Sequence, residues 1–577
     1  MWVRSVVAVV LATAFLLPAM FRRQRRRAGL EAGHLTPGWK RRLAVVSGLS
    51  VVIVVGGLGA LGGVASADGD PTGANTPDPA TAVQSVVPAD TPADASLPAV
   101  ASKVAKHETA INLTWLMVGG VLVLFMQAGF ALVETGFTRA KNGAHTMMMN
   151  LVIFALGAVG WFVCGYALMF GSTSASAIGL VSSGTSWHIG SWNVLAHSGF
   201  FLGGGAYDVS VMAFFFFQLV FMDATATIPT GAMAERWKFS SFCVWGLFAS
   251  MILYPFYGNW VWGGGFLSQL GAQGPKWGHG ALDFAGSGVV HAMGGVAAFW
   301  GARALGPRIG KFDQNGKPRA IPGHHLPMAF LGTMILLVGW MGFNGASTFA
   351  STDFRFTVVI VNTVLAAAFG CLTTMFTMWK VYGKPDPSMT CNGLLAGLVA
   401  ITAPCAYVAP WAAAVIGIVA GFLVVAAVVV VEHKAKVDDP VGAVAVHGAN
   451  GLWGLLALGL FADGKYGDGF NGVAGGVKGL FYGDAGQLAA QLTSALVLIL
   501  WCSVACITFF AILKRTVGMR VDEATELSGL DLPEMGALAY PDFLEAQGSV
   551  FYPVDHQAVA NLTPADAKSL REEVAAK

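Results

Sequence analysis

Long apolar runs separated by short polar loops dominate the chain from residue 110 onward. Each run is close to the roughly 20 residues that an α-helix needs to cross a bilayer. The pattern predicts eleven membrane-spanning helices, at 110–134, 147–170, 208–232, 239–258, 284–304, 326–346, 357–378, 391–410, 411–432, 442–462 and 486–513. The division inside 391–432 is the weakest, because only the stretch from Pro404 to Pro410 separates the two runs. We therefore expect an all-α polytopic membrane protein.

The first 67 residues have the features of a leader. An apolar run at 5–20 precedes a cluster of arginines, and a second run at 43–64 ends in Ala65-Ser66-Ala67. Basic residues, an apolar core and an Ala-x-Ala site are typical of a secretory signal peptide. Two interpretations stay open: Met20 is the true start and leaves one ordinary signal peptide, or the first run is a retained helix. Residues 68–107 are rich in Pro, Ala, Thr and Asp, which predicts a flexible extracytoplasmic linker.

The composition agrees with a membrane protein. Hydrophobic residues make up 55% of the 577 residues and charged residues only 11%, against about 25% charged in ordinary globular chains. The net charge of +2 identifies no partner, and we expect no nucleic-acid binding. The seven cysteines form no CxxC pair and have no metal-ligand spacing, so we interpret them as small buried side chains and expect no metal or other cofactor.

Lysine and arginine are distributed unequally between alternate loops, and cytoplasmic loops carry the excess of these residues. If the mature N-terminus is outside, the inner loops and the start of the tail hold 16 of them, from Arg139 to Arg520, and the outer loops hold four. We therefore expect a multi-pass protein of the cytoplasmic membrane, with a transmembrane domain at 108–513. The polar tail, 514–577, is expected in the cytoplasm.

Two histidines stand in similar apolar surroundings. His291 and His447 each lie eight residues after an aspartate, Asp283 and Asp439 respectively. The two stretches also share residues at matching positions, namely Gly286 and Gly442, Val290 and Val446, and Gly295 and Gly451. An ionisable side chain at membrane depth is costly, so it is a candidate functional residue.

The two histidine-bearing helices are expected to run in opposite directions, because the second is five helices after the first. Eight helical residues rise ~12 Å, which places each histidine at a similar depth of a ~30 Å core. An inverted repeat, with helices 1–5 against 6–10, would bring the rings together. Either histidine alone is explained as well by a hydrogen bond to a neighbouring helix. The pair favours a pore, and neutral imidazoles suit a small, polar, uncharged species.

Several motifs resemble the ammonium transporter (Amt/Mep/Rh) family, on its Amt side. They are Gly129-Phe-Ala-Leu-Val-Glu-Thr-Gly-Phe-Thr-Arg-Ala-Lys-Asn142, Gly231-Ala-Met-Ala-Glu-Arg-Trp-Lys-Phe239, Val261-Trp-Gly-Gly-Gly265, Ala281 through His291, Gly339-Trp-Met-Gly-Phe-Asn344, Val437-Asp-Asp-Pro440 and Val446-His-Gly448. The resemblance runs from about residue 110 to about residue 540. It implies a 5+5 inverted repeat with a long eleventh helix, and a homotrimer with one pore in each protomer.

The resemblance also implies site residues. Trp262, Ser347 and Phe217 resemble the external recruitment site for ammonium, and Asp283 resembles the aspartate that supports its vestibule. Phe221 and Phe343 resemble the stacked phenyl gate. His291, His447 and Trp340 resemble pore-lining residues, and Asn344 and Thr402 are weaker matches. Spacing agrees, because residues four apart share a helix face, although Trp262 by itself also fits an interfacial belt tryptophan.

The implied function is uptake of ammonium, with deprotonation near the gate and passage of ammonia along the histidines; methylammonium is an alternative substrate. A different class of function is an ammonium sensor that signals through its tail, where the resemblance suggests a PII-type signal protein as partner. We do not expect an enzyme, because no HExxH or GxSxG motif lies in a predicted helix. Asp223, where many relatives have a small residue, either attracts a cation or pairs with another helix.

Overall fold

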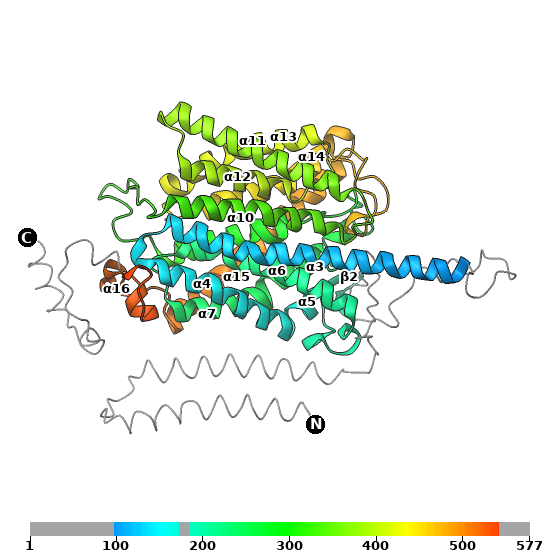
Figure 1. Cartoon of the computed structure of the whole chain (residues 1–577), viewed down its shortest axis with the longest axis horizontal. Coiled ribbons are helices and arrows are strands. Elements are labelled where there is room, and N and C mark those ends of the chain that lie inside the picture. The colour runs from blue at the N-terminus through cyan, green and yellow to red at the C-terminus, as the bar shows by residue number, and fades with distance from the viewer. Residues whose placement is uncertain (1–96, 172–184, 542–577) are drawn as a thin grey trace, which may run out of the picture.

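The helices of this protein lie side by side in a bundle, roughly along one direction (Figure 1). The computed structural model describes residues 97–171 and 185–541. The predicted leader, most of the predicted linker and the tail from residue 542 lie outside the described residues. Outside the loops, the described residues form helices, as expected, and one short β-hairpin.

The first five predicted segments correspond to helices or to consecutive helical segments. They are α3 (Leu97–Phe137); α4 (Gly143–Gly160) with the π-helical η5 (Trp161–Gly165) and α5 (Tyr166–Phe170); α6 (Val209–Met233); α7 (Phe239–Phe248) with η9 (Ala249–Leu253) and α8 (Tyr254–Val261); and η11 (Ser287–Ala292) with α9 (Met293–Leu305). Short 3₁₀ turns in this half are η4 (Ala140–Asn142), η7 (Phe200–Leu202), η8 (Gly204–Ala206) and η10 (Ser268–Leu270).

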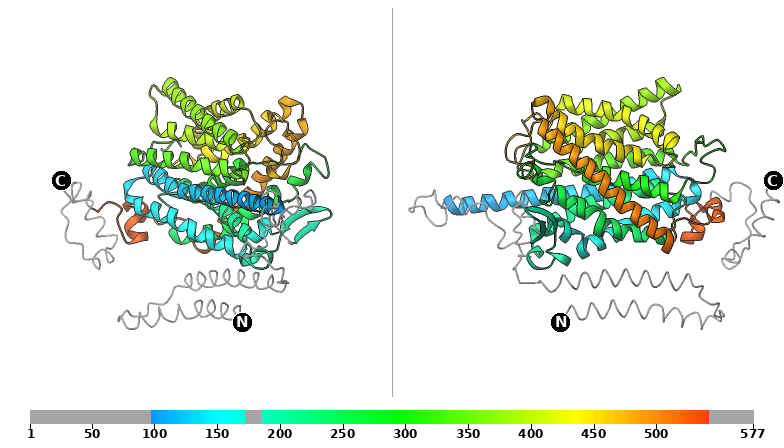
Figure 2. Two further views of the ribbon diagram at one scale, coloured as in Figure 1. Left: turned by 45° about the vertical axis from the view of Figure 1, so that its right-hand side comes forward. Right: turned by 180° about the vertical axis from the view of Figure 1, so that it is seen from behind.

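Six further helical segments follow in the second half. It contains α10 (Leu326–Gly345) with η12 (Ala346–Thr348); α11 (Phe356–Tyr382); α12 (Pro387–Ile401); α13 (Pro410–Val429) with η13 (Val430–Lys434); η14 (Val444–Ala449) with α14 (Asn450–Phe461); and α15 (Ala485–Thr516). The remaining segments are η15 (Phe470–Gly472), η16 (Leu480–Tyr482), α16 (Glu523–Ser528) and η17 (Asp531–Met535). The expected long eleventh helix is α15, whose 32 residues cross the bundle obliquely (Figure 2).

Nine helices of the described part are long and apolar enough to cross a membrane, and α12 is a shorter apolar helix. The division predicted within 391–432 is confirmed, because α12 ends at Ile401 and α13 begins at Pro410, although α12 begins and ends earlier than expected, at Pro387 and Ile401. Asp386 caps its start by accepting a hydrogen bond from the backbone N–H of Met389 at 2.9 Å. The segment before Pro410 forms turns, because proline disfavours helical geometry in the residue before it.

Two other features differ from the sequence expectations. Residues 97–107, assigned to the flexible linker, form the start of α3, which extends beyond the bundle in Figure 1. A short antiparallel hairpin joins β1 (Ser186–Ile189) to β2 (Trp192–Ala196), with Ser186 opposite Ala196. Neither segment has the length or apolar character of a membrane span, so the hydropathy pattern did not identify its structure.

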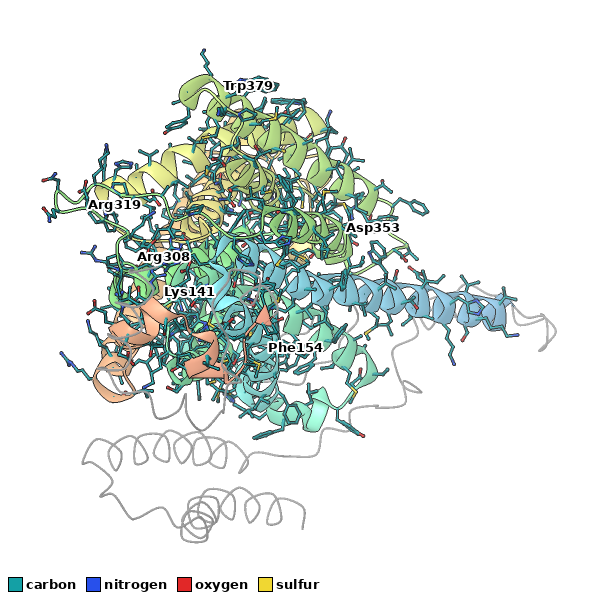
Figure 3. All side chains as sticks on the ribbon, turned by 60° about the vertical axis from the view of Figure 1, so that its left-hand side comes forward. Lys141, Phe154, Arg308, Arg319, Asp353 and Trp379 are labelled. Carbon is teal, nitrogen blue, oxygen red and sulfur yellow. The ribbon has the colours of Figure 1, made fainter. Side chains whose placement is uncertain are left out.

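Charged side chains gather in the loops at the end of the bundle that also carries the tail. Figure 3 shows Lys141 and Arg308 at that end and Asp353 at the opposite one. Arg308 donates to Glu235 at 2.7 Å and to both oxygens of Asp438 at 2.9 Å. Burial raises the pKa of the Asp438 carboxyl, but the charges of Arg236 and Arg308 outweigh it and hold the pKa well below its usual range. This buried ion-pair network joins three loops.

Candidate functional site

His291 and His447 each stand in a π-helical segment whose start is capped by an aspartate a few residues earlier. The Asp283 carboxylate accepts hydrogen bonds from the backbone N–H groups of Gly286, Gly288 and Val289 at 2.8–3.0 Å. Asp439 does the same for Val441, Gly442 and Val444 at 2.7–3.3 Å. Carboxylates at a helix start satisfy free N–H groups and face the positive end of the helix dipole. Both aspartates therefore position a histidine segment, and the carboxylate of Asp283 is not free for a substrate.

The shared glycines explain how the two histidine helices approach each other. A Cβ atom on Gly295 would lie 2.1 Å from the backbone nitrogen of Gly448, and one on Gly451 would lie 2.4 Å from the Ser287 carbonyl oxygen. Both contacts are with backbone, which has little freedom to move aside. Matching positions of the two stretches thus form a close helix crossing, as small residues do in membrane bundles.

This crossing brings His291 and His447 together as expected. Their Nδ1 atoms are 3.2 Å apart, and their rings are nearly parallel, with centroids separated by 5.2 Å. His291 is fully buried, and its Nε2 atom has no hydrogen-bond partner among the described residues. A buried ring nitrogen without a partner is costly unless a bound molecule supplies the missing hydrogen bond.

Aromatic rings continue the column from His291 in one direction. His291 stacks on Trp340 at 4.9 Å and on Phe343 at 5.4 Å between centroids. Phe343 stacks on Phe221 at 4.0 Å with an angle of 24° between the ring planes. Phe221 and Phe343 are fully buried. The two phenyl rings therefore close the space above the histidines in this structure.

The three residues expected at the outer recruitment site lie next to the stacked phenyl rings. Phe217 contacts Phe221 at 4.7 Å and Trp262 contacts Phe221 at 6.3 Å between centroids. The Trp262 indole donates to the Asp283 carbonyl oxygen at 2.6 Å, which holds the tryptophan in place. The Ser347 hydroxyl donates to the Phe343 carbonyl at 2.7 Å, so the remaining lone pairs of its oxygen are able to accept a hydrogen bond.

Thr402 and Asn344, the two weaker matches to the family, contact residues around the aromatic column but are not part of the column itself. Thr402 accepts a hydrogen bond from the Trp340 indole at 2.9 Å, which orients the ring beside His291. Asn344 donates to Thr363 on α11 at 2.9 Å, while its own oxygen has no partner among the described residues. Thr402 therefore positions Trp340, and Asn344 ties α10 to α11.

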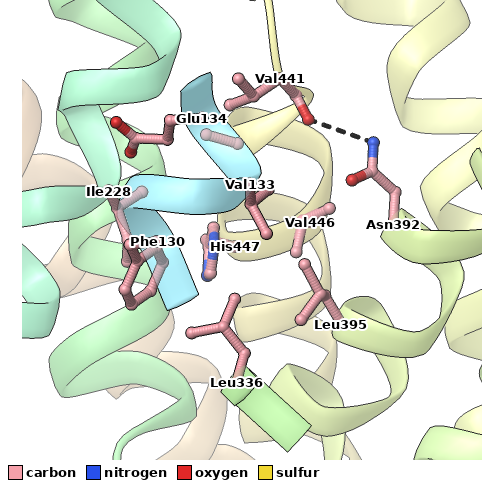
Figure 4. Close-up of a pocket in the computed structure, with 11 residues that line it drawn as sticks. Phe130, Val133, Glu134, Ile228, Leu336, Asn392, Leu395, Val441, Val446 and His447 are labelled. Carbon is pink, nitrogen blue, oxygen red and sulfur yellow. Dashed lines mark hydrogen bonds between the residues drawn. The ribbon is translucent and has the colours of Figure 1, made fainter. Parts of the chain in front are cut away.

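A small cavity lies on the other side of His447 (Figure 4). The residues that line it are Phe130, Val133, Glu134, Ile228, Leu336, Asn392, Leu395, Val441, Ala443, Val446 and His447. The sequence reasoning did not single out Phe130 or Glu134. Glu134 stands inside a predicted span, where a buried acid is a candidate functional residue, and this signal was available.

Asp223 is buried on α6 and is absent from the residues that line this cavity. Its Oδ1 atom has no hydrogen-bond partner among the described residues, and no ion pair of that part of the chain includes it. Of the two interpretations of Asp223, an ion pair with another helix is thus not seen there.

Comparison with known proteins agrees with this arrangement. The profile of the Ammonium Transporter Family matches residues 114–540. The chain is 47% identical over 443 residues to ammonium transporter Amt2 of Archaeoglobus fulgidus, covering 76% of this chain and 90% of that one. It is 36% identical to ammonium transporter Amt1 of Haloferax mediterranei over 76% of this chain and 81% of the other.

Solved structures give the same result. A protein described as a sensor Amt protein superposes with a TM-score of 0.65 at 32% identity, covering 74% of this chain and 99% of that one. Mep2 of Candida albicans superposes with a TM-score of 0.63 at 29% identity, covering 77% and 94%. The chain therefore belongs to the ammonium transporter family.

Proposed function

We propose that this protein takes up ammonium across the cytoplasmic membrane through a pore lined by His291 and His447. Membership of the ammonium transporter family supports the transport of ammonium by this protein. The observation that supports the route is the continuous column of Phe221, Phe343 and the two imidazoles. Its apolar walls favour a neutral species over a cation.

The proposed path begins with recruitment of the cation. Ammonium lies against the rings of Trp262 and Phe217 by cation–π attraction, worth ~0.5–2 kcal/mol. Ser347, whose hydroxyl hydrogen is already donated to Phe343, accepts an N–H hydrogen bond. Potassium has no hydrogen to donate, so this contact favours ammonium over a cation of similar size.

Ammonium then loses a proton near Phe221 and Phe343. Moving an ion into an apolar site without compensation costs nominally tens of kcal/mol. Deprotonation costs far less, about 3 kcal/mol, because the ammonium pKa is roughly two units above neutral pH and each unit is 1.36 kcal/mol. Ammonia then passes the histidines, whose ring nitrogens offer hydrogen bonds without a fixed charge.

The assembly and orientation belong to the same proposal. Each pore lies within one protomer of a homotrimer, with the mature N-terminus outside and the tail in the cytoplasm. The tail is a candidate docking site for a PII-type signal protein. One contact between the tail and the bundle supports a tail that docks at the end of the bundle where α4 begins. The Asp531 carboxylate accepts a hydrogen bond from the backbone N–H of His145, at the start of α4, at 2.9 Å.

A sensor is the second candidate, and the similarity to the sensor Amt protein favours testing it. The test is flux and electrical recording from purified protein in liposomes during an ammonium pulse. A transporter moves ammonium down its gradient at a rate well above that of protein-free liposomes. Binding of ammonium without flux would identify a sensor and contradict the proposed transport.

A further inference from the structure

Glu134 is a buried carboxyl group that the proposed transport path leaves unused. It lies in the last turn of α3 and is only 3% exposed. It also lines the cavity next to His447, as Figure 4 shows. Among the described residues that line this cavity, Glu134 and His447 are the two with titratable side chains. The position is therefore one where a proton could pass between the protein and a molecule leaving the pore.

The size of the cavity suits one ammonia or water molecule. Its volume is about 20 Å³, and a water molecule needs roughly 10–15 Å³ on the same measure. No hydrogen bond joins Glu134 to His447 in the described part of the chain, because the Glu134 carboxyl is bonded to α4 and α6. A molecule in the cavity is thus required to connect the two groups.

The surroundings of Glu134 favour a carboxyl group that holds a proton. Asn150 donates to its Oε2 atom at 2.7 Å. No ion pair within the described residues includes Glu134. A carboxylate buried without a cation costs several kcal/mol, and such a group usually stays neutral instead.

The Thr230 hydroxyl group makes this proton transferable. Its oxygen is 2.5 Å from the Thr227 carbonyl oxygen, and 2.7 and 2.8 Å from the two oxygens of Glu134. A hydroxyl group has one hydrogen to donate. If Thr230 donates to Thr227, the short contact with Glu134 requires a proton on the carboxyl. If Thr230 donates to Glu134, the contact is satisfied by a carboxylate. Rotating one O–H bond therefore accommodates Glu134 with or without its proton.

A hydrogen-bonded chain holds the carboxyl group in this position. Thr227 donates to Gln127 at 3.0 Å, and Gln127 donates to the side chain of Asn150 at 3.2 Å. Asn150 in turn donates to Glu134. The chain joins α3, α4 and α6, so three helices fix the geometry of one carboxyl group at the cavity.

We propose that Glu134 is a proton-transfer residue at the inner end of the pore, where ammonia regains the proton that ammonium sheds near the gate. This inference rests on the proposed function. In the first step the O–H bond of Glu134 breaks, an N–H bond forms on ammonia in the cavity, and ammonium leaves a carboxylate behind. In the second step the proton shed near the gate passes to His291 and across the Nδ1–Nδ1 contact to His447, and the resulting imidazolium of His447 returns one proton to the carboxylate through a water molecule in the cavity. One ammonium is lost outside and one is formed inside, so one charge crosses in each cycle.

The experiment compares charge movement with ammonia flux for the full chain in liposomes. Ammonium-evoked current gives the charge, and the total ammonia plus ammonium that accumulates inside the liposomes, assayed chemically, gives the flux of ammonia. Glu134→Gln keeps the shape of the side chain but has no transferable proton. We expect its ratio of charge to ammonia to fall by roughly a hundredfold, the lower end of what positioned proton-transfer groups contribute. Glu523→Gln, the same change at an exposed acid of the tail outside the cavity lining, is expected to keep the ratio of the unmodified protein.

Two further variants keep the test decisive if Glu134→Gln does not assemble. Glu134→Asp retains a titratable group at a longer distance and should give an intermediate ratio. Thr230→Val retains the carboxyl but removes the alternating hydroxyl, and the ratio should fall. An unchanged ratio in assembled Glu134→Gln overturns the proposal, and so does an equal loss of current and ammonia flux, which indicates a structural role. If the unmodified protein moves ammonia without current, the proposal for Glu134 fails while the proposed transport stands.

Discussion

The Nδ1 atoms of His291 and His447 are 3.2 Å apart, although 156 residues separate them in the chain. At this distance one imidazole donates a hydrogen bond that the other accepts. The contact fixes which nitrogens remain for a passing molecule, including the Nε2 atom of His291, which lacks a partner among the described residues.

Replacing both histidines tests the pore directly. In the double variant His291→Leu, His447→Leu, the ring nitrogens that offer hydrogen bonds are lost, while the apolar volume remains. We expect ammonium uptake to fall about tenfold or more, equivalent to at least ~1.4 kcal/mol in the barrier, or discrimination against potassium to weaken. Uptake into liposomes with and without competing potassium measures both. Unchanged uptake and selectivity in a correctly assembled trimer would falsify the pore role of the pair.

Removing the proposed recruitment site should affect affinity more than maximal rate. Ser347→Ala with Trp262→Leu removes one hydrogen-bond acceptor and one cation–π contact, together about 1.5–3 kcal/mol. The concentration for half-maximal transport should therefore rise roughly 10- to 100-fold, with a smaller change in the maximal rate. Concentration series of initial uptake rates give the two constants. The opposite pattern, a lower maximal rate at unchanged affinity, would place these residues elsewhere in the path.

The close helix crossing predicts a sharp contrast between two glycines. Gly295→Ala places a Cβ atom 2.1 Å from the Gly448 backbone nitrogen, whereas Gly448→Ala meets nothing closer than 3.5 Å. We expect Gly295→Ala to lower stability by about 1–3 kcal/mol through overpacking and to separate the histidines. Gly448→Ala should be tolerated. Thermal unfolding of the purified variants in detergent, with uptake measured alongside, compares them; equal stability would show that the crossing adapts.

The ion-pair network at the tail end of the bundle makes stability depend on pH. Because the folded pKa of Asp438 lies below its unfolded value of about 3.9, its contribution is fully present above that value. The contribution is lost as the pH falls through the folded pKa. Asp438→Asn should lower stability by about 3–5 kcal/mol at neutral pH, since it leaves Arg308 with an incomplete buried partner. The difference from the unmodified protein should shrink in strongly acidic buffer.

Apparent unfolding temperatures between neutral and strongly acidic pH test this dependence. Glu523→Gln is a matched control, because Glu523 is an exposed acid in the tail, where surface charges contribute little. We expect its unfolding temperature to match that of the unmodified protein. A pH-independent difference between Asp438→Asn and the unmodified protein would contradict the role of this carboxylate.

Local sequence features were sufficient for much of the fold. Apolar run length predicted the helices, since a bilayer imposes the same length and hydropathy on every crossing. The repeated Asp-to-His spacing predicted the meeting of His291 and His447, because the direction of a membrane helix follows from its number in the chain. The motifs then supported the family, which the comparisons confirm. The roles of the individual site residues stay predictions until transport is measured.

Tertiary structure decided what spacing does not encode. Eight residues separate Asp283 from His291 in the sequence, but only the folded backbone shows that the carboxylate caps a π-helical segment. Glu134 was visible as an acid in a predicted span, whereas its contact with Thr230 on α6 depends on how two helices pack. The start of α3 at Leu97 also escaped the hydropathy pattern.

The sequence by itself thus determined the spans, their alternating direction and the histidine pair, because membrane thickness and helix rise act on each segment separately. Packing between segments far apart in the chain decided which side chains meet. It also decided which hydroxyl group bonds to which carboxyl group and which ring nitrogen lacks a partner among the described residues. Those contacts depend on distances of a few tenths of an ångström, and the order of residues along one helix does not specify them.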